Sequence, residues 1–333
     1  MTEKAMIYPD IIVMGSYLVD MVARVDELPR PEESKIVKSL TKLPGGKGSN
    51  QSIAVAYMGG KVALISAVGE DTEGIDAQKL WQQSQVDKSL VKIVPDAGTG
   101  QCLITVDTTG RSTFAAYLGA LEKVNLKYIE EQKSFIEHSK VFVCSSTDFS
   151  VEVNQTALSL ANSAKSITIY RNQPIQNLPT GFLESVQILI GNALEIEHLS
   201  GKNILDERGN VTDLEDVKNA GREILKLGPK TVIVTIGARG FILISEKIAW
   251  HIPNYPGGAP VDFARVIDAL TGALAVGLAE QFEYEKIIKY MKAAATLSAS
   301  KRQDSHITRK IPNRTEIEDI VEKYHAITPY IAI

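Results

Sequence analysis

The residues with the clearest chemical potential are the segment 45–51, Gly-Gly-Lys-Gly-Ser-Asn-Gln. Glycines let a backbone approach a ligand closely, and a helix that begins here would offer free N–H groups to an anion. Asn50 and Gln51 add polar groups on the first helical turn, where a sugar-like ligand could be bound. The spacing of a Walker A loop is missing. An ordinary strand–turn–helix junction would explain the glycines alone equally well.

A later segment, residues 261–268, carries two acids, Asp262 and Asp268. Asp268 opens a run of small and apolar residues at helical spacing, so we expect it at the start of a helix. Aspartate is favoured there as an N-cap for helix stability alone, and this interpretation stands beside a catalytic one. The five histidines of the chain show no zinc-type ligand spacing.

Short apolar runs rich in β-branched residues recur along the chain, with helix-like segments between them. Continuous apolar strands that alternate with helices are typical of a parallel sheet covered on both faces, so the pattern predicts a three-layer α/β/α architecture. Further helices are expected at 268–282, at 285–300 and after Asn313, a potential N-cap three residues before Glu316. The predicted strands lie at 11–15, 61–69, 141–144, 166–170, 186–190 and 231–235.

Two regions, about 17–44 and 98–118, alternate apolar and polar residues instead. Such alternation indicates strands with one solvated face. We therefore expect a single domain over 1–333 with a small β lid inserted into its α/β core. A small sheet with one apolar face commonly needs a partner, which favours a homodimer formed through the lid.

Composition excludes several other functions. A net charge of −4 and a pI near 5.8 give no electrostatic footprint for nucleic acid. No apolar run approaches the ~18–20 residues that span a bilayer, and the first residues lack a signal-peptide pattern. Cys102 and Cys144 lie in apolar contexts, which favours buried thiols in a reducing compartment. We expect a cytoplasmic protein without a membrane partner.

Taken together, these segments resemble the PfkB carbohydrate kinase family, in its ribokinase branch. The resemblance implies a ribokinase-like fold and transfer of the γ-phosphate of ATP to a hydroxymethyl group of a sugar or nucleoside. It also implies Mg²⁺ and, less directly, K⁺ as cofactors. It covers nearly the whole chain in the right order, through residues 15–20, 28–31, 45–51, 69–74, 98–100, 192–195, 235–240 and 311–312.

The resemblance also assigns roles to single residues. It makes Asp268 the base at a helix N-terminus, where the preceding backbone amides would form an anion hole. It places Glu195 in a motif that organises magnesium, and Asp262 near a monovalent cation. The implied sugar contacts are Asp20, Gly46, Lys47 and Asn50, and the implied nucleotide contacts are Asn192, Thr235, Gly237 and Gly240.

The chain departs from the family pattern at several of these places. Residues 263–267, Phe-Ala-Arg-Val-Ile, stand where the family has Thr-Thr-Gly-Ala-Gly, so Ile267 puts a branched side chain where phosphate should approach backbone. Loss of oxyanion-type donors costs about 3–4 kcal/mol in enzymes. Arg265 could supply a cation instead, since arginine binds phosphate well. Leu18 and Leu121 replace asparagines that would read sugar hydroxyls, which argues against plain ribose.

Three functions therefore stay open from the sequence. The first is an active kinase with an unusual site. The second is a catalytically impaired pseudokinase that binds a sugar or nucleotide, or acts as a regulatory or scaffold subunit. The third is a structural subunit that dimerises through the lid. Unusual residues at 170–172 (Tyr-Arg-Asn) and the loss of the family's Gly-Ala pair within 298–310 bear on the same choice.

Overall fold

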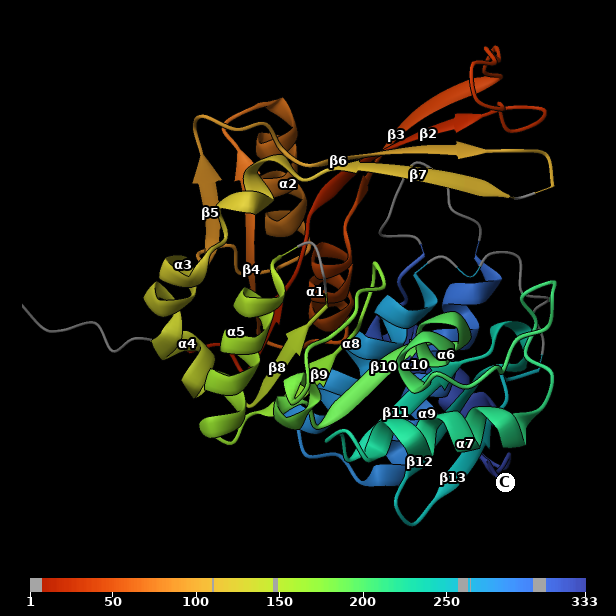
Figure 1. The fold of residues 1–333 in the computed structure, drawn as a ribbon. Coiled ribbons are helices and arrows are strands. Elements are labelled where there is room, and N and C mark those ends of the chain that lie inside the picture. Colours follow the sequence, from red (N-terminus) through yellow and green to blue (C-terminus); the bar gives the residue numbers. More distant parts are fainter. Residues whose placement is uncertain (1–7, 110, 146–148, 257–262, 264, 302–309) are drawn as a thin grey trace, which may run out of the picture.

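The computed structural model describes residues 8–333 except 110, 146–148, 257–262, 264 and 302–309. Its core is a ten-stranded sheet with helices packed against it (Figure 1). In spatial order the strands are β14 (Ile331–Ala332), β13 (Ala249–Ile252), β12 (Phe241–Ser245), β11 (Thr231–Thr235), β10 (Ile188–Asn192), β9 (Ile167–Tyr170), β8 (Val141–Cys144), β1 (Ile11–Met14), β4 (Val62–Gly69) and β5 (Val91–Val94).

Side chains of the central strand β1 divide between two hydrophobic cores. Ile11 and Val13 belong to one core, and Ile12 and Met14 belong to the other. Because successive strand residues point to opposite faces, both faces of the sheet are covered, which confirms the three-layer architecture.

Helices supply the outer layers on the two faces. Those that contribute to the first core are α1 (Lys47–Tyr57), α2 (Thr72–Gln83), α8 (Val266–Ala279), α9 (Tyr284–Ser300) and α10 (Arg314–Lys323). Those that contribute to the second core are α3 (Leu126–Glu131), α4 (Lys133–His138), α5 (Val151–Ser163), α6 (Ala193–Ser200) and α7 (Leu214–Leu225). Short 3₁₀ turns are η1 (Gly119–Lys123), η2 (Phe182–Ser185) and η3 (Gly237–Arg239).

The sheet is mixed rather than purely parallel. All the runs predicted as buried strands pair in parallel, for example β1 with both β4 and β8. Beyond β11 the chain returns through a short turn into β12, and β12 and β13 pair antiparallel. These two strands were not predicted from the sequence. A short connection permits only an antiparallel neighbour, because a parallel one needs a long crossover.

The two alternating regions form a separate four-stranded sheet, here called the lid sheet. Its strand order is β3 (Ser39–Gly45), β2 (Leu18–Arg24), β6 (Gln101–Val106) and β7 (Ser112–Tyr117). It projects from the body at the upper right of Figure 1, above α1 and α8. Its inner end is buried at Leu18 and Leu43, whereas β7 is exposed along its whole length.

Helix α8 begins earlier than predicted. Arg265 is its N-cap residue, so Asp268 is the third helical residue, and the interpretation of Asp268 as an N-cap is wrong. Small residues let α8 lie close to α1: a Cβ on Gly272 would come within 2.5 Å of the Ala54 Cβ. The capped helix predicted after Asn313 is confirmed as α10, with a complete capping box to Glu316.

Candidate functional site

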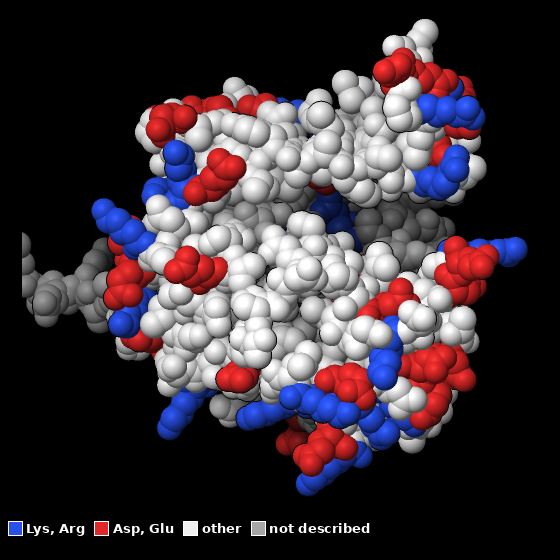
Figure 2. Space-filling view, in the orientation of Figure 1, with Lys and Arg blue, Asp and Glu red and all other residues white. Residues whose placement is uncertain are grey.

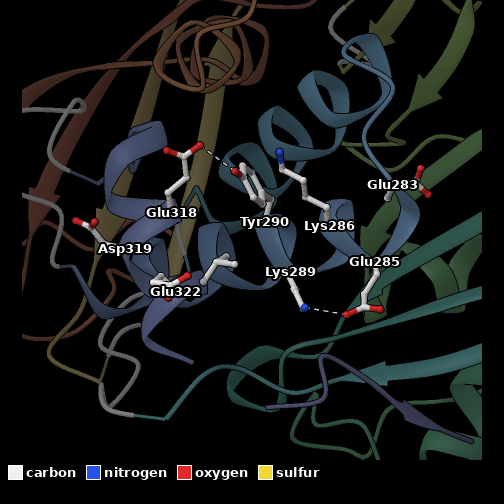
Figure 3. A pocket seen from close by; sticks show the side chains of 9 residues that line it. Glu283, Glu285, Lys286, Lys289, Tyr290, Glu318, Asp319 and Glu322 are labelled. Carbon is white, nitrogen blue, oxygen red and sulfur yellow. Dashed lines mark hydrogen bonds and ion pairs between the residues drawn. The ribbon is translucent and has the colours of Figure 1, made fainter. Parts of the chain in front are cut away.

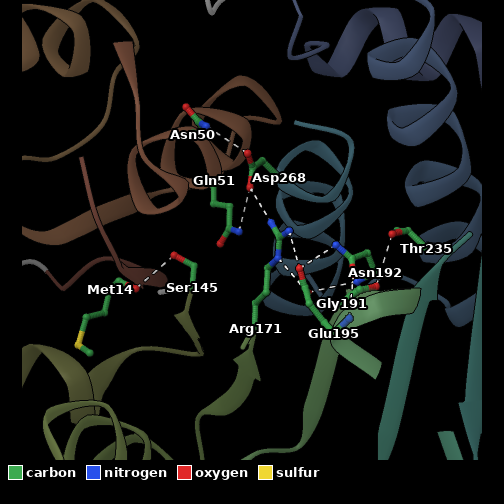
Figure 4. Close-up of polar contacts among 10 residues, drawn as sticks. All are labelled: Met14, Asn50, Gln51, Ser145, Arg171, Gly191, Asn192, Glu195, Thr235 and Asp268. Carbon is green, nitrogen blue, oxygen red and sulfur yellow. Dashed lines mark hydrogen bonds and ion pairs between the residues drawn. The ribbon is translucent and has the colours of Figure 1, made fainter. Parts of the chain in front are cut away.

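Asp268 is held where α1 and α8 meet. Asn50 donates a hydrogen bond from Nδ2 to Asp268 Oδ2, and Gln51 donates one from Nε2 to Asp268 Oδ1, both at 3.1 Å (Figure 4). All three side chains are buried. The carboxylate also lies in the first turn of α8, where the helix dipole favours negative charge. The fold thus brings together two motifs that are 218 residues apart in sequence.

A buried arginine links this acid to the next strand end. Arg171 directly follows β9 and donates two hydrogen bonds to Glu195, from Nη2 to Oε1 at 3.1 Å and from Nε to Oε2 at 3.3 Å. Its third nitrogen, Nη1, lies 3.8 Å from Asp268 Oδ1. Figure 4 shows the guanidinium between the two acids. This arginine stands out as unusual in the sequence, but no role was predicted for it.

Asn192 and Glu195 form the start of α6. The Asn192 side chain accepts from the Glu195 backbone N–H at 2.9 Å, and Glu195 Oε2 accepts from the Asn192 backbone N–H at 3.2 Å. This reciprocal arrangement is a capping box. Asn192 Nδ2 also donates to Glu195 Oε1 at 2.9 Å. The predicted pair is therefore close together, and its contacts serve the helix start as well as any ligand.

The resemblance implies that Glu195 helps to organise a magnesium ion, and its contacts show whether it has acceptor positions left for one. A carboxylate offers about four lone-pair positions, and Glu195 receives four donors: two from Arg171 and two from Asn192. Within the described residues, no group of three or more His, Cys, Asp or Glu side chains could hold a metal ion. As arranged, the site does not fit a magnesium ion bound directly to Glu195.

The predicted sugar contacts lie at the junction of the lid sheet and α1. Gly46 has φ +87°, and a Cβ there would come within 2.5 Å of the Ser16 carbonyl oxygen, so glycine is required. Asp20 on β2 lies against Gly45, where an added Cβ would be 2.3 Å from Asp20 Oδ2. Burial raises the pKa of the Asp20 carboxyl to about 6, against the opposing charges of Arg265 and Lys47.

Arg265 takes a left-handed backbone conformation, with φ +70°, at a position where the resemblance implies glycine. Such a conformation costs roughly 1–3 kcal/mol in a residue with a side chain. The guanidinium turns toward the lid sheet, donating from Nη2 to the Pro44 carbonyl at 3.0 Å and lying 4.0 Å from Asp20 Oδ2. Arg265 is thus placed beside the predicted sugar contacts, and Arg171 is the arginine that faces Asp268.

The predicted nucleotide contacts follow neighbouring strand ends. Asn192 on β10 pairs in register with Thr235 on β11, and Thr235 Oγ1 donates to the Gly191 carbonyl at 3.5 Å. Gly237 and Gly240 flank the next turn, and Gly240 has φ +94° with no room for a Cβ beside the Ile252 carbonyl. The carboxyl ends of the strands thus gather these residues at the edge where open α/β sheets bind ligands.

Some predicted positions lie elsewhere. Asp262 and most of the 298–310 segment fall outside the described residues. Leu18 and Leu121 are buried apolar side chains. Gln51 makes a contact to Asp268 that was not predicted, although the sequence places Gln51 on the same helical turn as Asn50. A polar side chain in the first turn of a buried helix was the available signal for this contact.

The surface of the molecule is concave in more than one place. Figure 2 shows a hollow beneath the lid sheet, with basic atoms at its back. A second depression lies between α9 and α10 (Figure 3). Polar contacts are made within its lining: Lys289 forms an ion pair with Glu285 at 2.7 Å, and the Tyr290 hydroxyl donates a hydrogen bond to Glu318 at 2.9 Å. None of the predicted site residues lines that depression.

In the parts of the chain that the structure describes, no helix has both the length and the apolar character needed to cross a bilayer.

Comparison with known proteins gives a consistent result. The family model described as pfkB family carbohydrate kinase matches residues 9–321. The chain is 28% identical over 307 residues to a ribokinase of Mus musculus, covering 90% of this chain and 92% of that protein. A ribokinase structure from Thermotoga maritima superposes with a TM-score of 0.81 at 26% identity, covering 95% of this chain and all of that one.

A second structural relative is described as Arabidopsis thaliana ribokinase complexed with ribose and ATP. It superposes with a TM-score of 0.81 at 21% identity, and covers 95% of this chain and 99% of that one. The central sheet with its helices and the separate small sheet are therefore a ribokinase-like fold, as the sequence predicted.

Proposed function

Because the chain belongs to the pfkB family of carbohydrate kinases, we propose that it transfers the γ-phosphate of ATP to a hydroxymethyl group of a sugar or nucleoside, with Asp268 as base. One observation carries this proposal: Asp268 is buried in the first turn of α8 and is oriented by Asn50 and Gln51. Such a network is more than helix capping requires, since Asp268 is not the N-cap residue.

In the proposed step the acceptor hydroxyl gives its proton to Asp268 while its oxygen forms a bond to the γ-phosphorus. The bond from that phosphorus to the β,γ-bridging oxygen breaks at the same centre. ADP leaves with the electron pair of that bond, and the proton later passes from Asp268 to solvent. Phosphoryl transfer depends mainly on positioning and charge stabilisation, so a fixed carboxylate next to the acceptor suits it.

The acceptor would be bound from the lid side. Asp20, Gly46 and Lys47 border the lid sheet and α1, while Asn192, Thr235 and the 237–240 turn lie at the strand ends where ATP would be bound. Asp268 lies in the network that joins Asn50 to Arg171 and Glu195. Magnesium would enter as part of the Mg·ATP substrate, and a site for K⁺ stays a prediction because Asp262 is outside the described residues.

The direct test is ATP consumption with magnesium and potassium across a panel of sugars and nucleosides. We expect turnover with one acceptor class, and Asp268→Asn should lower kcat at least ~10²–10⁴-fold, the range that a general base contributes. Circular dichroism and ATP binding should be unchanged in the variant. Full activity in Asp268→Asn would remove this residue from the role of base.

The pseudokinase alternative rests on one specific observation. Ile267 is buried in the hydrophobic core at the position where the family has the last glycine before the base. If this change has removed the anion hole, the chain binds ATP or a sugar without forming product. Tight binding of ATP with no phosphorylated product from any acceptor, in folded protein, would support that function instead.

A further inference from the structure

We propose that Arg171 is a phosphate-binding residue that contacts the transferred phosphoryl group through Nη1. It would supply a fixed positive charge beside Asp268, where the chain has replaced the glycines of the usual anion hole. This phosphate contact rests on the proposed phosphotransfer function, and it concerns a residue for which neither the resemblance nor the sequence pattern predicts a role.

The three guanidinium nitrogens of Arg171 are used unequally. Nε and Nη2 are both committed to Glu195, in the two-pronged geometry that fixes an arginine most firmly. Nη1 makes no hydrogen bond to any residue that the structure describes; its contact there is the ion pair with Asp268 at 3.8 Å. The guanidinium is therefore anchored on one side and keeps two N–H groups for a ligand on the other.

Arg171 also lies where a transferred phosphoryl group would pass. It follows β9 directly, and its partners Glu195 and Asp268 lie in the first turns of α6 and α8. Arg171 therefore lies at the carboxyl edge of the sheet between the predicted nucleotide contacts and the base (Figure 4). A phosphoryl group that passes from ATP to an acceptor hydroxyl bound beside Asp268 must cross this space. An oxygen of that group within hydrogen-bond reach of Nη1 would be stabilised as charge develops on it.

Glu195 is already saturated by protein donors. Its four acceptor positions are filled, two of them by Arg171 and two by Asn192. The positive charge next to this carboxylate is therefore supplied by the Arg171 side chain. Burial makes this charge effective, because Arg171 and Glu195 are both less than a tenth exposed. The competing interpretation is that Arg171 is only a structural counter-ion for two buried acids.

The experiment compares binding of β,γ-methylene ATP and of ADP by calorimetry, with Mg²⁺ and without acceptor. We expect Arg171→Met to weaken binding of the ATP analogue ~10- to 100-fold, the effect of one charged hydrogen-bonding contact, and to leave ADP within ~3-fold. The affinity of Arg171→Lys for the ATP analogue should lie between those of the wild type and Arg171→Met, since lysine keeps the charge but cannot make both hydrogen bonds to Glu195. Arg314→Met, which breaks an ion pair with Glu280 at the far end of α8, is the matched control and should change neither affinity.

Removal of Arg171 leaves Glu195 buried and without its cation, so Arg171→Met could unfold. The double variant Arg171→Met/Glu195→Gln removes both charges and keeps the test valid, with Glu195→Gln alone as its reference. If Arg171 binds phosphate, the double variant still loses the preference for the ATP analogue over ADP. If the double variant regains the preference for the ATP analogue, Arg171 is only a counter-ion and the proposal is overturned. The proposal is also overturned if Arg171→Met weakens binding of both nucleotides equally, or weakens neither.

The outcome can be separated from that of the proposed function. A preference that depends on Arg171, without turnover of any acceptor, would uphold the phosphate contact and contradict the kinase. Turnover with unchanged preference in Arg171→Met would uphold the kinase and overturn the phosphate contact. A wild-type chain that binds neither nucleotide would contradict both.

Discussion

Asp20 keeps an ionisable carboxyl group in a largely desolvated position, and the resulting loss of folding stability depends on pH. Its pKa is raised from 3.8 to about 6, so the folded state binds a proton more tightly than the unfolded chain. The favourable contribution to folding is complete below pH 3.8 and is lost as the pH rises through about 6. We expect Asp20→Asn to increase the free energy of unfolding by about 1–2 kcal/mol at pH 8 and by roughly half as much at pH 5.

Urea unfolding of both proteins at the two pH values measures this difference, and acceptor KM measured in parallel should rise in the variant. Asp107 gives a control of opposite sign, because hydrogen bonds from Thr109 and Arg111 lower its pKa to about 2. Asp107→Asn should therefore lower stability at neutral pH, and its effect should shrink as the pH falls toward 2. A gain from Asp20→Asn that is the same at both pH values would show that charge burial is not its cause.

At the scale of elements, the position of α1 depends on direct backbone contact with the end of β1. A Cβ on Gly48 would lie 2.4 Å from the Gly15 carbonyl carbon, and no flexible side chain there could move aside. Gly48→Ala should therefore shift the start of α1, which carries the two amides that hold Asp268. We expect a loss of stability of about 1–3 kcal/mol and a lower kcat, measured by urea unfolding and by ATP consumption.

Gly98→Ala is the matched control, since its Cβ would meet nothing closer than 3.6 Å. It should change stability by less than ~0.5 kcal/mol. If Gly48→Ala matched this control in stability and in kcat, the close approach of α1 to β1 would not be what positions Asn50 and Gln51.

At the scale of the whole molecule, the lid sheet leaves apolar side chains uncovered. Strand register places Leu40, Leu103 and Tyr117 on one of its faces, each more than half exposed. We predict that two copies associate through this face, because a thin sheet with exposed edges and an exposed apolar face is prone to pair. Leu103→Lys should shift the protein from dimer to monomer in sedimentation velocity at micromolar concentration.

Leu227, on the body after α7, is 49% exposed and serves as the control: Leu227→Lys should leave the sedimentation coefficient unchanged. A wild-type chain that sediments as a monomer over the whole concentration range would contradict association through the lid sheet.

The sequence predicted those parts of the fold that local pattern specifies. β1 and β8 were found because strands buried on both faces are continuously apolar, and α10 was found from Asn313 and Glu316 at capping-box spacing. The start of α8 was missed because residues 263–267 lack the glycines that mark a turn. Arg171 was missed because its contacts to Glu195 and Asp268 depend on how separate strand ends meet, which no local pattern contains.

The division of the candidate site between the lid sheet and the body has an evolutionary consequence. Asp20 is carried by the lid sheet, whereas Asp268, Arg171 and Glu195 are carried by the body. Because β7 is exposed along its whole length, mutations there encounter little packing constraint within one chain, and in the predicted dimer this freedom is confined to the face opposite Tyr117. Selection can therefore alter this part of the lid sheet at little cost in stability, whereas changes at Asp268, Arg171 or Glu195 would break a buried network. In directed evolution, a library placed in β7 would therefore keep more folded variants than one placed in that network.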